Sequence, residues 1–345
     1  MKHYGCEDDL FRRARERGIP INADMELTYR CNLDCVHCFN CPTDNKELSF
    51  KEVVSVIDQL ARGGVIFLTL GGGEPLIRRD FFDIAFYARR RGFALSLYTN
   101  ATLVTKESAK KIALLHPRCV SATMYGASEK GYAKTTGDPG AFHKAVRGIR
   151  LLSEEKLPLD VCAMAFRSTS IKDLLWMKEF SKGLGAWWSL YTLFLLRTNG
   201  DPTPLKYGVT KSQCEALLEK FPEIRLRPKR RRRDASSRVC GSLRTNVYVS
   251  PYGNVGSCSM LTSKESIRER SLMSIWKNSY VLRTQREFKL AKLHKCLHCE
   301  SLPYCQPCIA NNYVCTGKFG EPVEVACENK HMLRECSEKF LSAGT

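Results

Sequence analysis

The sequence lacks any hydrophobic run long enough to cross a membrane. Its longest aromatic and aliphatic stretch, Ala186–Leu196, contains Ser189 and Thr192 and is far shorter than the roughly 20 residues of a membrane-spanning helix. The sequence also does not open on a charged segment followed by an apolar one, which is the pattern of a secretory signal peptide. We therefore expect a cytoplasmic protein with no membrane partner.

Acidic residues are in the minority, since 36 Asp and Glu face 54 Lys and Arg and leave a net charge of +18. Such a charge attracts anionic partners, and an acidic peptide would suit it. The most basic run is Lys229–Arg233; a run of this kind is also typical of a solvated loop, and net charge also serves solubility. The sequence contains no recognised nucleic-acid-binding module and no basic-aromatic repeat, which disfavours a nucleic-acid partner.

Cysteine, by contrast, is plentiful. The chain has 17 cysteines, which is an odd number, and without export a framework of disulfides is not expected. Clusters of cysteines in a cytosolic chain more often bind metal or take part in catalysis. Metal binding is therefore the interpretation that we favour.

Three of these thiols form a CxxxCxxC motif, Cys31, Cys35 and Cys38, directly after a short apolar stretch that we predict to be a strand. Iron-sulfur clusters are normally held by four cysteine thiolates, so a cluster held by three keeps one iron open for a small molecule. That open position indicates a catalytic site. For the motif alone the alternatives are a disulfide, a set of zinc ligands, or thiols that pack as small hydrophobic groups.

A glycine-rich turn follows the next predicted strand. Val65–Leu70 has a buried-strand pattern, and the residues directly after it are Gly71, Gly72, Gly73, Glu74 and Pro75. Glycine tolerates positive φ and has no side chain, so Gly72 and Gly73 can bring their backbone close to a ligand, while Pro75 stiffens the exit. Such a turn is an ordinary loop in most proteins, but here it follows a strand and comes soon after the cysteine motif.

Together these residues resemble the radical S-adenosylmethionine (radical SAM) superfamily, in which a CxxxCxxC motif precedes a GGEP element at the end of the second strand. The resemblance implies that Cys31, Cys35 and Cys38 hold a 4Fe-4S cluster whose open iron binds SAM. An electron then breaks a carbon-sulfur bond of SAM and yields a 5′-deoxyadenosyl radical, which abstracts hydrogen from an unactivated carbon. The resemblance also implies a reductant such as flavodoxin or ferredoxin.

The same resemblance implies which residues contact SAM. They are Gly72, Gly73, Glu74 and Pro75 in the glycine-rich turn, Asn100 at the end of the third strand, and Ser121 in the fourth strand. Asn100 lies in an element that resembles the family's TNG sequence with alanine in place of glycine, and Ser121 lies in one that resembles SLxG. Hydrogen bonding at the strand end is the alternative role for Asn100 and Ser121.

The pattern from Met25 to about Leu196 alternates short apolar runs with helix-length amphipathic stretches. We predict strands at Met25–Arg30, Val65–Leu70, Phe93–Thr99, Cys119–Tyr125, Leu159–Phe166 and Trp187–Leu195. The predicted helices between them include Leu48–Leu60, Phe81–Arg91, Lys106–Leu115, Ala141–Ser153 and Ile171–Lys182. This alternation predicts a parallel sheet with helices outside it.

The radical SAM resemblance makes this α/β fold an open partial (β/α)6 barrel, with ligands at the carboxyl ends of its strands. A small cysteine-rich iron-sulfur domain is expected to follow the barrel. The predicted domains are an N-terminal extension (1–24), the barrel (25–225), a basic linker (226–239) and the iron-sulfur domain (240–345).

The C-terminal part resembles the SPASM domain of peptide-modifying maturases. Its opening is Cys240, Gly253 and Cys258, and its later cysteines are Cys296, Cys299, Cys305, Cys308 and Cys327. The usual pattern is CX2CX5CX3C, with three residues between its last two cysteines, whereas only two residues separate Cys305 from Cys308 here. The resemblance implies two auxiliary 4Fe-4S clusters, a distal one on Cys296, Cys299, Cys305 and Cys327 and a nearer one on Cys240, Cys258 and Cys308.

The nearer cluster is one cysteine short, so either Cys315 is recruited or one iron stays open for substrate. Taken without the front of the chain, paired CxxC units are also signatures of zinc. We treat the other cysteines as structural thiols.

SPASM relatives mostly modify peptides or proteins, so we expect a radical SAM enzyme that matures a ribosomal peptide by a crosslink, an oxidation or a related change. The alternatives are a radical SAM enzyme acting on a tetrapyrrole or other small molecule, and an iron-sulfur electron carrier or zinc-dependent binding module, which would not need the glycine-rich turn. Only about 24 residues precede the first strand, so a separate protein that recognises the leader peptide is expected. No acidic residue is singled out by position as a catalytic acid or base.

Overall fold

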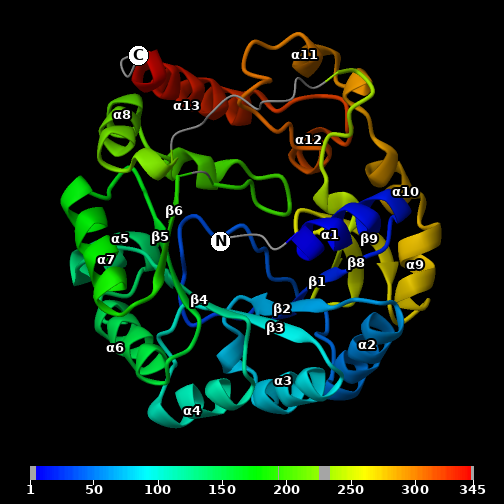
Figure 1. The fold of residues 1–345 in the computed structure, drawn as a ribbon, viewed down its shortest axis with the longest axis horizontal. Coiled ribbons are helices and arrows are strands. Elements are labelled where there is room, and N and C mark those ends of the chain that lie inside the picture. The colour runs from blue at the N-terminus through cyan, green and yellow to red at the C-terminus, as the bar shows by residue number, and fades with distance from the viewer. Residues whose placement is uncertain (1–4, 193, 225–233, 343–345) are drawn as a thin grey trace.

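The computed structural model describes residues 5–192, 194–224 and 234–342, and it is built around one curved sheet (Figure 1). The strand order is β6-β5-β4-β3-β2-β1-β7-β8-β9. The first six strands are parallel, and they are β1 (Asn22–Thr28), β2 (Phe67–Gly72), β3 (Ala94–Thr99), β4 (Cys119–Met124), β5 (Leu159–Met164) and β6 (Trp187–Tyr191). The sheet is open because β6 and β9 are its two edges, which confirms the predicted open partial barrel.

Helices cover the outer face of the parallel strands (Figure 1). Those of the barrel half are α2 (Phe50–Arg62), α3 (Phe81–Arg90), α4 (Lys106–Leu114), α5 (Glu129–Thr136), α6 (Ala141–Glu154), α7 (Ile171–Gly183) and α8 (Lys211–Lys220). The first helix, α1 (Gly5–Arg17), instead packs on the inner face, where the Phe11 ring stacks on Phe67 of β2 with ring centroids 5.9 Å apart. Three-residue 3-10 turns, η1 (Pro75–Ile77), η3 (Pro222–Ile224) and η4 (Ser242–Arg244), and the longer η2 (Thr203–Tyr207) interrupt the loops. No helix in the described part of the chain is long and apolar enough to cross a membrane.

The C-terminal half extends the same sheet. β7 (Asn246–Val249) runs parallel to β1, and β8 (Asn254–Cys258) and β9 (Leu261–Ser266) follow it antiparallel. The helices of this half are α9 (Leu272–Asn278), α10 (Tyr280–Glu287), η5 (Leu290–Lys292), α11 (His294–Leu297), α12 (Ile309–Thr316) and the longer α13 (Glu324–Ser342). Cys299, Cys305 and Cys308 lie in the loop between α11 and α12. The predicted barrel and iron-sulfur domain are therefore joined by strand pairing between β1 and β7. Residues 225–233, which include the basic run of the predicted linker, lie outside the described residues.

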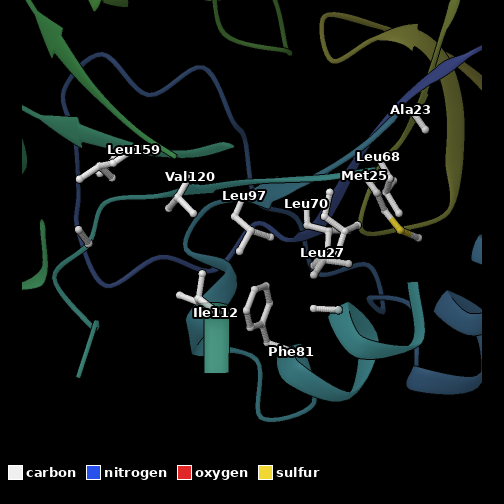
Figure 2. Packing of buried hydrophobic residues seen from close by; sticks show 14 of the residues in the cluster. Ala23, Met25, Leu27, Leu68, Leu70, Phe81, Leu97, Ile112, Val120 and Leu159 are labelled. Atoms are coloured by element: carbon white, nitrogen blue, oxygen red, sulfur yellow. The ribbon is translucent and has the colours of Figure 1, made fainter. Parts of the chain in front are cut away.

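Alternation along the strands divides the sheet into an apolar outer face and a polar inner face. Met25, Leu70 and Leu97 point outward and pack with Phe81 and other buried side chains (Figure 2). Purely parallel sheets are usually apolar on both faces because helices cover both. Here helices cover the outer face, whereas the inner face lines a cavity towards the carboxyl ends of the strands.

The predicted strands and helices are all present, with small shifts at their ends. β1 begins at Asn22, three residues before the predicted start, because Asn22 pairs with Asn246 of β7 and donates its N–H to the Thr245 carbonyl at 2.9 Å. That partner lies more than 200 residues away in the sequence. β6 ends at Tyr191 rather than at the predicted Leu195.

Candidate active site

The CxxxCxxC loop leaves the carboxyl end of β1 and brings its three thiols together. Burial raises the pKa of Cys35 to about 12, and the neighbouring thiols of Cys38 and Cys31 raise it as well. Cys31 is exposed, and all three thiols line one cavity of about 1080 Å³ at the carboxyl ends of the strands. Crowded thiols hold their protons until a metal makes the thiolate form favourable, so this group suits a cluster ligated by three cysteines.

The glycine-rich turn packs directly against the backbone of this loop. Gly72 has φ +131°, and a Cβ built on it would lie 2.2 Å from the Thr28 carbonyl oxygen. A Cβ on Gly73 would lie 2.3 Å from the Arg30 carbonyl oxygen. Both positions therefore require glycine, and both residues line the cavity as predicted.

Glu74 and Pro75 follow the cavity wall but turn into the protein. The Glu74 carboxylate accepts hydrogen bonds from the Thr99 hydroxyl at 2.9 Å and from the Asn100 N–H at 2.7 Å. Burial raises the pKa of Glu74 to about 7, and these donors oppose the rise. Glu74 thus fastens the end of β2 to the end of β3, and Pro75 starts the turn η1.

Asn100 lies in the cavity wall, and Ser121 lies deeper in the barrel. The Asn100 side-chain N–H donates to the Asn32 side-chain oxygen at 3.1 Å and to Cys31 Sγ at 3.7 Å. Ser121 shares a hydrogen bond of 2.9 Å with Cys162 Sγ, and Thr123, two residues further along β4, lines the cavity in its place. Hydrogen bonding, the alternative role, accounts for Ser121 in this structure.

Aromatic rings close one side of the cavity beside the cysteine loop. The His37 ring packs against Phe166 and Phe194, with ring centroids 4.9 and 5.6 Å apart. Burial lowers the pKa of His37 to about 4, so this ring is neutral. Two cations, Arg30 and Arg197, also line the cavity.

One group in the cavity wall was not predicted from the sequence. Glu26 on β1 accepts a short hydrogen bond of 2.5 Å from the Tyr248 hydroxyl on β7, and the Tyr29 and Tyr248 hydroxyls lie 2.8 Å apart. Burial raises the pKa of Glu26 to about 7. The available signal was the alternation of Asp24 and Glu26 with apolar residues in β1, which points two carboxylates into the lumen.

The C-terminal cysteines lie in two neighbouring groups, and Cys308 is near Cys258 in the first group and also lines the pocket of the second. Burial raises the pKa of Cys258 to about 12, and the nearby thiols Cys308 and Cys240 add to the rise. This group adjoins the large cavity, because Ser259 next to Cys258 lines it. Cys315 is exposed and its thiol donates to the Gly200 carbonyl at 3.4 Å.

The second group surrounds a small pocket of about 90 Å³ that is lined by Cys296, Cys299, Cys305 and Cys327. Burial raises the pKa of Cys296 to about 11, and the other three thiols contribute. His331 Nε2 lies 3.4 Å from Cys299 Sγ, and the amine of Lys330 is near Cys305 and Cys308. Burial lowers the pKa of Lys330, and those two thiols oppose the fall.

The spacing within these groups bears on the zinc alternative. In the described residues no three or more His, Cys, Asp or Glu side chains are arranged to hold a single metal ion. A structural zinc site needs four ligands about 2.0–2.3 Å from one ion, whereas each thiolate of an iron-sulfur cluster binds a different iron. The thiols gathered on the cysteine loop and around the small pocket are the ligand type that iron-sulfur clusters use.

Comparison with known proteins decides the family. Residues 25–174 match the model of the radical SAM superfamily, and residues 240–300 match that of the iron-sulfur cluster-binding domain SPASM. A heme synthase from Methanosarcina barkeri that depends on S-adenosylmethionine is 30% identical over 330 residues, which cover 86% of this chain and 93% of that protein. This chain belongs to the radical SAM superfamily.

Other proteins similar to this radical SAM protein are named for a different product or are described with a bound peptide. Mycofactocin maturase MftC of Mycobacterium tuberculosis is 27% identical over 295 residues, covering 79% of this chain and 74% of MftC. The crystal structure of SuiB from Streptococcus suis bound to its precursor peptide SuiA superposes with a TM-score of 0.70 at 15% identity, covering 94% of this chain and 82% of SuiB. The SuiB match establishes the fold alone.

The two family domains imply a 4Fe-4S cluster and SAM as cofactors of this radical SAM protein. The chain is therefore an enzyme of the radical SAM/SPASM type. The gathered thiols of the first loop, on a cavity that Gly72 and Gly73 also line, fit these cofactors.

Proposed function

We propose that this radical SAM enzyme modifies a peptide or protein, by a crosslink, an oxidation or a related change during maturation. The observation that carries the proposal is the large cavity, which residues from both halves line together. Cys31 and Gly73 come from the barrel, and Tyr248 and Ser259 come from the C-terminal half. Its volume of about 1080 Å³ is at the upper end of the range for small-molecule sites, about 300–1000 Å³.

In this proposal Cys31, Cys35 and Cys38 hold the catalytic cluster. With SAM bound, that cluster supplies a 5′-deoxyadenosyl radical. Gly72 and Gly73 let their turn pack against the backbone of Thr28 and Arg30 beside the cavity, and Glu74 keeps the turn in place through Thr99 and Asn100. The hydrogen bond from Asn100 to Cys31 Sγ favours the thiolate form of that ligand.

We further propose two auxiliary 4Fe-4S clusters in the SPASM half. Cys296, Cys299, Cys305 and Cys327 supply four ligands to the distal cluster, and Cys240, Cys258 and Cys308 supply three to the nearer one. The thiol of Cys315 is engaged with the Gly200 carbonyl, which supports an open position on the nearer cluster. Ser259, the residue after Cys258, lines the large cavity, which supports an open position close to the substrate.

The named functions of MftC and SuiB support a peptide substrate. A specific observation favours a second candidate, a tetrapyrrole. The heme synthase matches nearly the whole chain, and Arg30 and Arg197 in the cavity wall could pair with the carboxylates of a porphyrin. In either case the proposal places the enzyme in the reducing cytoplasm, with a flavodoxin or ferredoxin as electron donor. For a peptide substrate, a separate leader-recognition protein completes the proposed set of partners.

The test offers both substrate classes to the anaerobically reconstituted enzyme with SAM and dithionite. Synthetic peptides encoded by short reading frames beside the gene form one arm, and iron coproporphyrin III forms the other. We expect a mass change in a peptide together with 5′-deoxyadenosine, and neither with the variant Cys31→Ala/Cys35→Ala/Cys38→Ala. Loss of carboxyl groups from the porphyrin, with unchanged peptides, would replace the first candidate by the second.

A further inference from the structure

A cluster of four arginines lies on the C-terminal half, outside the active site. Its members are Arg238, Arg244, Arg283 and Arg286. Arg244 belongs to η4 and its guanidinium donates to the Glu16 carbonyl of α1 at 3.0 Å. Arg283 and Arg286 belong to α10, which lies near α1 in Figure 1.

Arg244 and Arg286 each lie near other arginines, and Glu287 is the acidic residue near both. Burial lowers the pKa of Arg286, and the neighbouring charges of Arg244 and Arg283 lower it further against the opposing effect of Glu287. Arg286 Nη1 is buried and has no hydrogen-bond partner among the described residues. A buried guanidinium nitrogen without an acceptor is costly, and an anion placed there would supply the missing acceptor and reduce the repulsion.

A groove of about 700 Å³ borders this arginine cluster, and we call it the α1–α9 groove. Arg17, Arg62 and Lys277 line it, and none of the three has an ion-pair partner within residues 5–192, 194–224 and 234–342. Met273 and Ile19, which is 39% exposed, also line it and add apolar surface. The groove therefore offers cations and an apolar wall together.

The cluster and the groove are continuous through Trp276 and Gly18. The Arg286 guanidinium lies over the Trp276 ring at 4.6 Å from its centroid, and the Trp276 indole N–H donates to the Gly18 carbonyl at 3.4 Å. A Cβ on Gly18 would lie 3.6 Å from Arg244 Nη2. A single bound ligand can therefore contact both the arginine cluster and the α1–α9 groove.

This surface lies at the opposite end of the barrel from the cysteine loop. Gly18 is just before β1 and Arg62 is in the last turn of the helix that precedes β2, so both are at the amino ends of these strands. The large cavity is at the carboxyl ends, which a strand of this length places about 20 Å away. A partner bound here would leave the active site open.

We propose that the arginine cluster and the α1–α9 groove together bind an acidic segment of a polypeptide partner, one that carries carboxylates and at least one apolar side chain. The carboxylates pair with the guanidinium groups, where charge-assisted hydrogen bonds are strongest, and the apolar side chain covers Met273 and Ile19. Free phosphate or a nucleic-acid backbone would use the cations and leave the apolar wall in water. The inference rests on the proposed function only in taking a polypeptide as the partner.

The experiment measures binding of two fluorescein-labelled 15-residue peptides to the reconstituted enzyme by fluorescence anisotropy, without SAM or reductant. One peptide combines Glu with Leu and Phe, and the other has Gln in place of every Glu. We expect the acidic peptide to bind at least tenfold more tightly at low salt, with affinity falling as salt rises. Because no turnover is needed, failure here is separate from failure of the proposed function.

Two variants and a control locate the site. Arg17→Gln/Arg62→Gln/Lys277→Gln changes exposed side chains only, and Arg244→Gln/Arg286→Gln removes the half-buried pair, with its fold checked by circular dichroism. Each variant should weaken binding of the acidic peptide about tenfold or more. The control is Arg89→Gln/Arg90→Gln, which changes two exposed arginines at the end of α3 and should weaken that binding less than twofold.

Competing anions decide the kind of partner. Equal weakening by the control variant, or equal binding of the Gln peptide, would overturn the proposal and leave only a general charge effect. Displacement by inorganic phosphate at low millimolar concentration would identify a small-anion site instead. Tighter binding of a 15-nucleotide oligouridylate than of the acidic peptide would identify a nucleic-acid partner and overturn the polypeptide part.

Discussion

The two cysteine-bearing regions of the molecule are built in opposite ways. The first three thiols sit on a single loop whose start is held by β1 and by the turn at Gly72 and Gly73, next to the main hydrophobic core. The C-terminal thiols come from separate loops and short helices. Residues 298–308, which contain three of them, form no helix or strand, and the adjoining core has six buried residues.

This difference indicates that the scaffold shapes the first site, whereas the clusters themselves shape much of the C-terminal half. A small region with little core of its own commonly depends on metal for its fold. The barrel has a core of its own and does not need a cluster for that purpose. The predictions that follow test this contrast, from the largest expected effect to the smallest.

The largest difference is expected between Cys35→Ala and Cys299→Ala. Cys35→Ala removes a ligand of the proposed catalytic cluster and should lower the yield of 5′-deoxyadenosine from SAM more than about 1000-fold. Cys299→Ala should lower that yield less than tenfold but abolish the modified product. The yield is measured by chromatography of anaerobic reactions with dithionite.

Iron content provides the control for this comparison. The native enzyme should hold about twelve irons if three 4Fe-4S clusters form, and each variant should hold fewer. Equal loss of SAM cleavage in both variants would mean that the two regions do not fold independently. It would contradict the proposed difference between the barrel and the C-terminal region. About four irons in the native enzyme would remove the auxiliary clusters.

Removal of iron should loosen the C-terminal region far more than the barrel. We expect backbone amides of residues 294–308 to exchange with deuterium about 100-fold faster after chelation, because their order depends on the clusters. Amides of β2, β3 and β4 should change less than threefold. Hydrogen exchange with mass spectrometry measures both regions in one sample, and an equal increase in the barrel would show that its first cluster also supports the fold.

A pair of glycine substitutions compares the two regions at the backbone. Gly72→Ala puts a Cβ 2.2 Å from the Thr28 carbonyl oxygen at φ +131°, and should lower the free energy of unfolding by about 3 kcal/mol or more. Gly253→Ala, at φ +89° with its closest contacts to side-chain atoms at 3.1 Å, should cost about 1–2 kcal/mol. Urea unfolding followed by circular dichroism gives both values. A larger loss for Gly253→Ala would mean that the turn before β8, not the turn after β2, is the more constrained one.

The sequence was sufficient for the features that depend on local pattern. Six strands and their helices follow from apolar periodicity, and the structure has each of them. The two C-terminal thiol sets, by contrast, were implied by the resemblance to the SPASM domain. Glu74 was predicted to contact SAM because it follows the glycines, but its carboxylate turns inward to Thr99 and Asn100. A residue's direction at the end of a strand depends on the next strand, which the local sequence does not contain.

Long-range pairing explains the other features that the sequence did not reveal. The early start of β1 depends on β7, and the pairing of Glu26 with Tyr248 joins residues 222 positions apart. The arginine cluster likewise assembles from η4 and α10 against α1. Each of these contacts crosses between the barrel half and the C-terminal half, where no local spacing rule applies.

The smallest expected effect also concerns the contact between the barrel half and the C-terminal half. It is the pH dependence of the free energy of unfolding that Glu26→Gln should remove. A carboxyl whose pKa rises from 4.5 to about 7 on folding binds more protons in the folded state between those values, so native stability falls as pH rises through that window. The full shift would correspond to roughly 3 kcal/mol at 1.36 kcal/mol for each pKa unit. Because Glu26 borders a cavity and is partly exposed, we expect about 1–2 kcal/mol.

The measurement compares unfolding free energies of the native enzyme and Glu26→Gln from pH 5 to pH 8.5. Glu26→Gln should gain relative stability as pH rises, because glutamine has no proton to lose, and the gain should level off above about pH 7.5. Glu52→Gln is the matched control. The pKa of Glu52 is lowered to about 2 by its hydrogen bond with Arg268, so the control should differ from the native enzyme by a constant amount over this range. A flat difference for Glu26→Gln would mean that Glu26 is already ionised at pH 5, with Tyr248 and cavity water sufficient to stabilise its charge at the junction of the two regions.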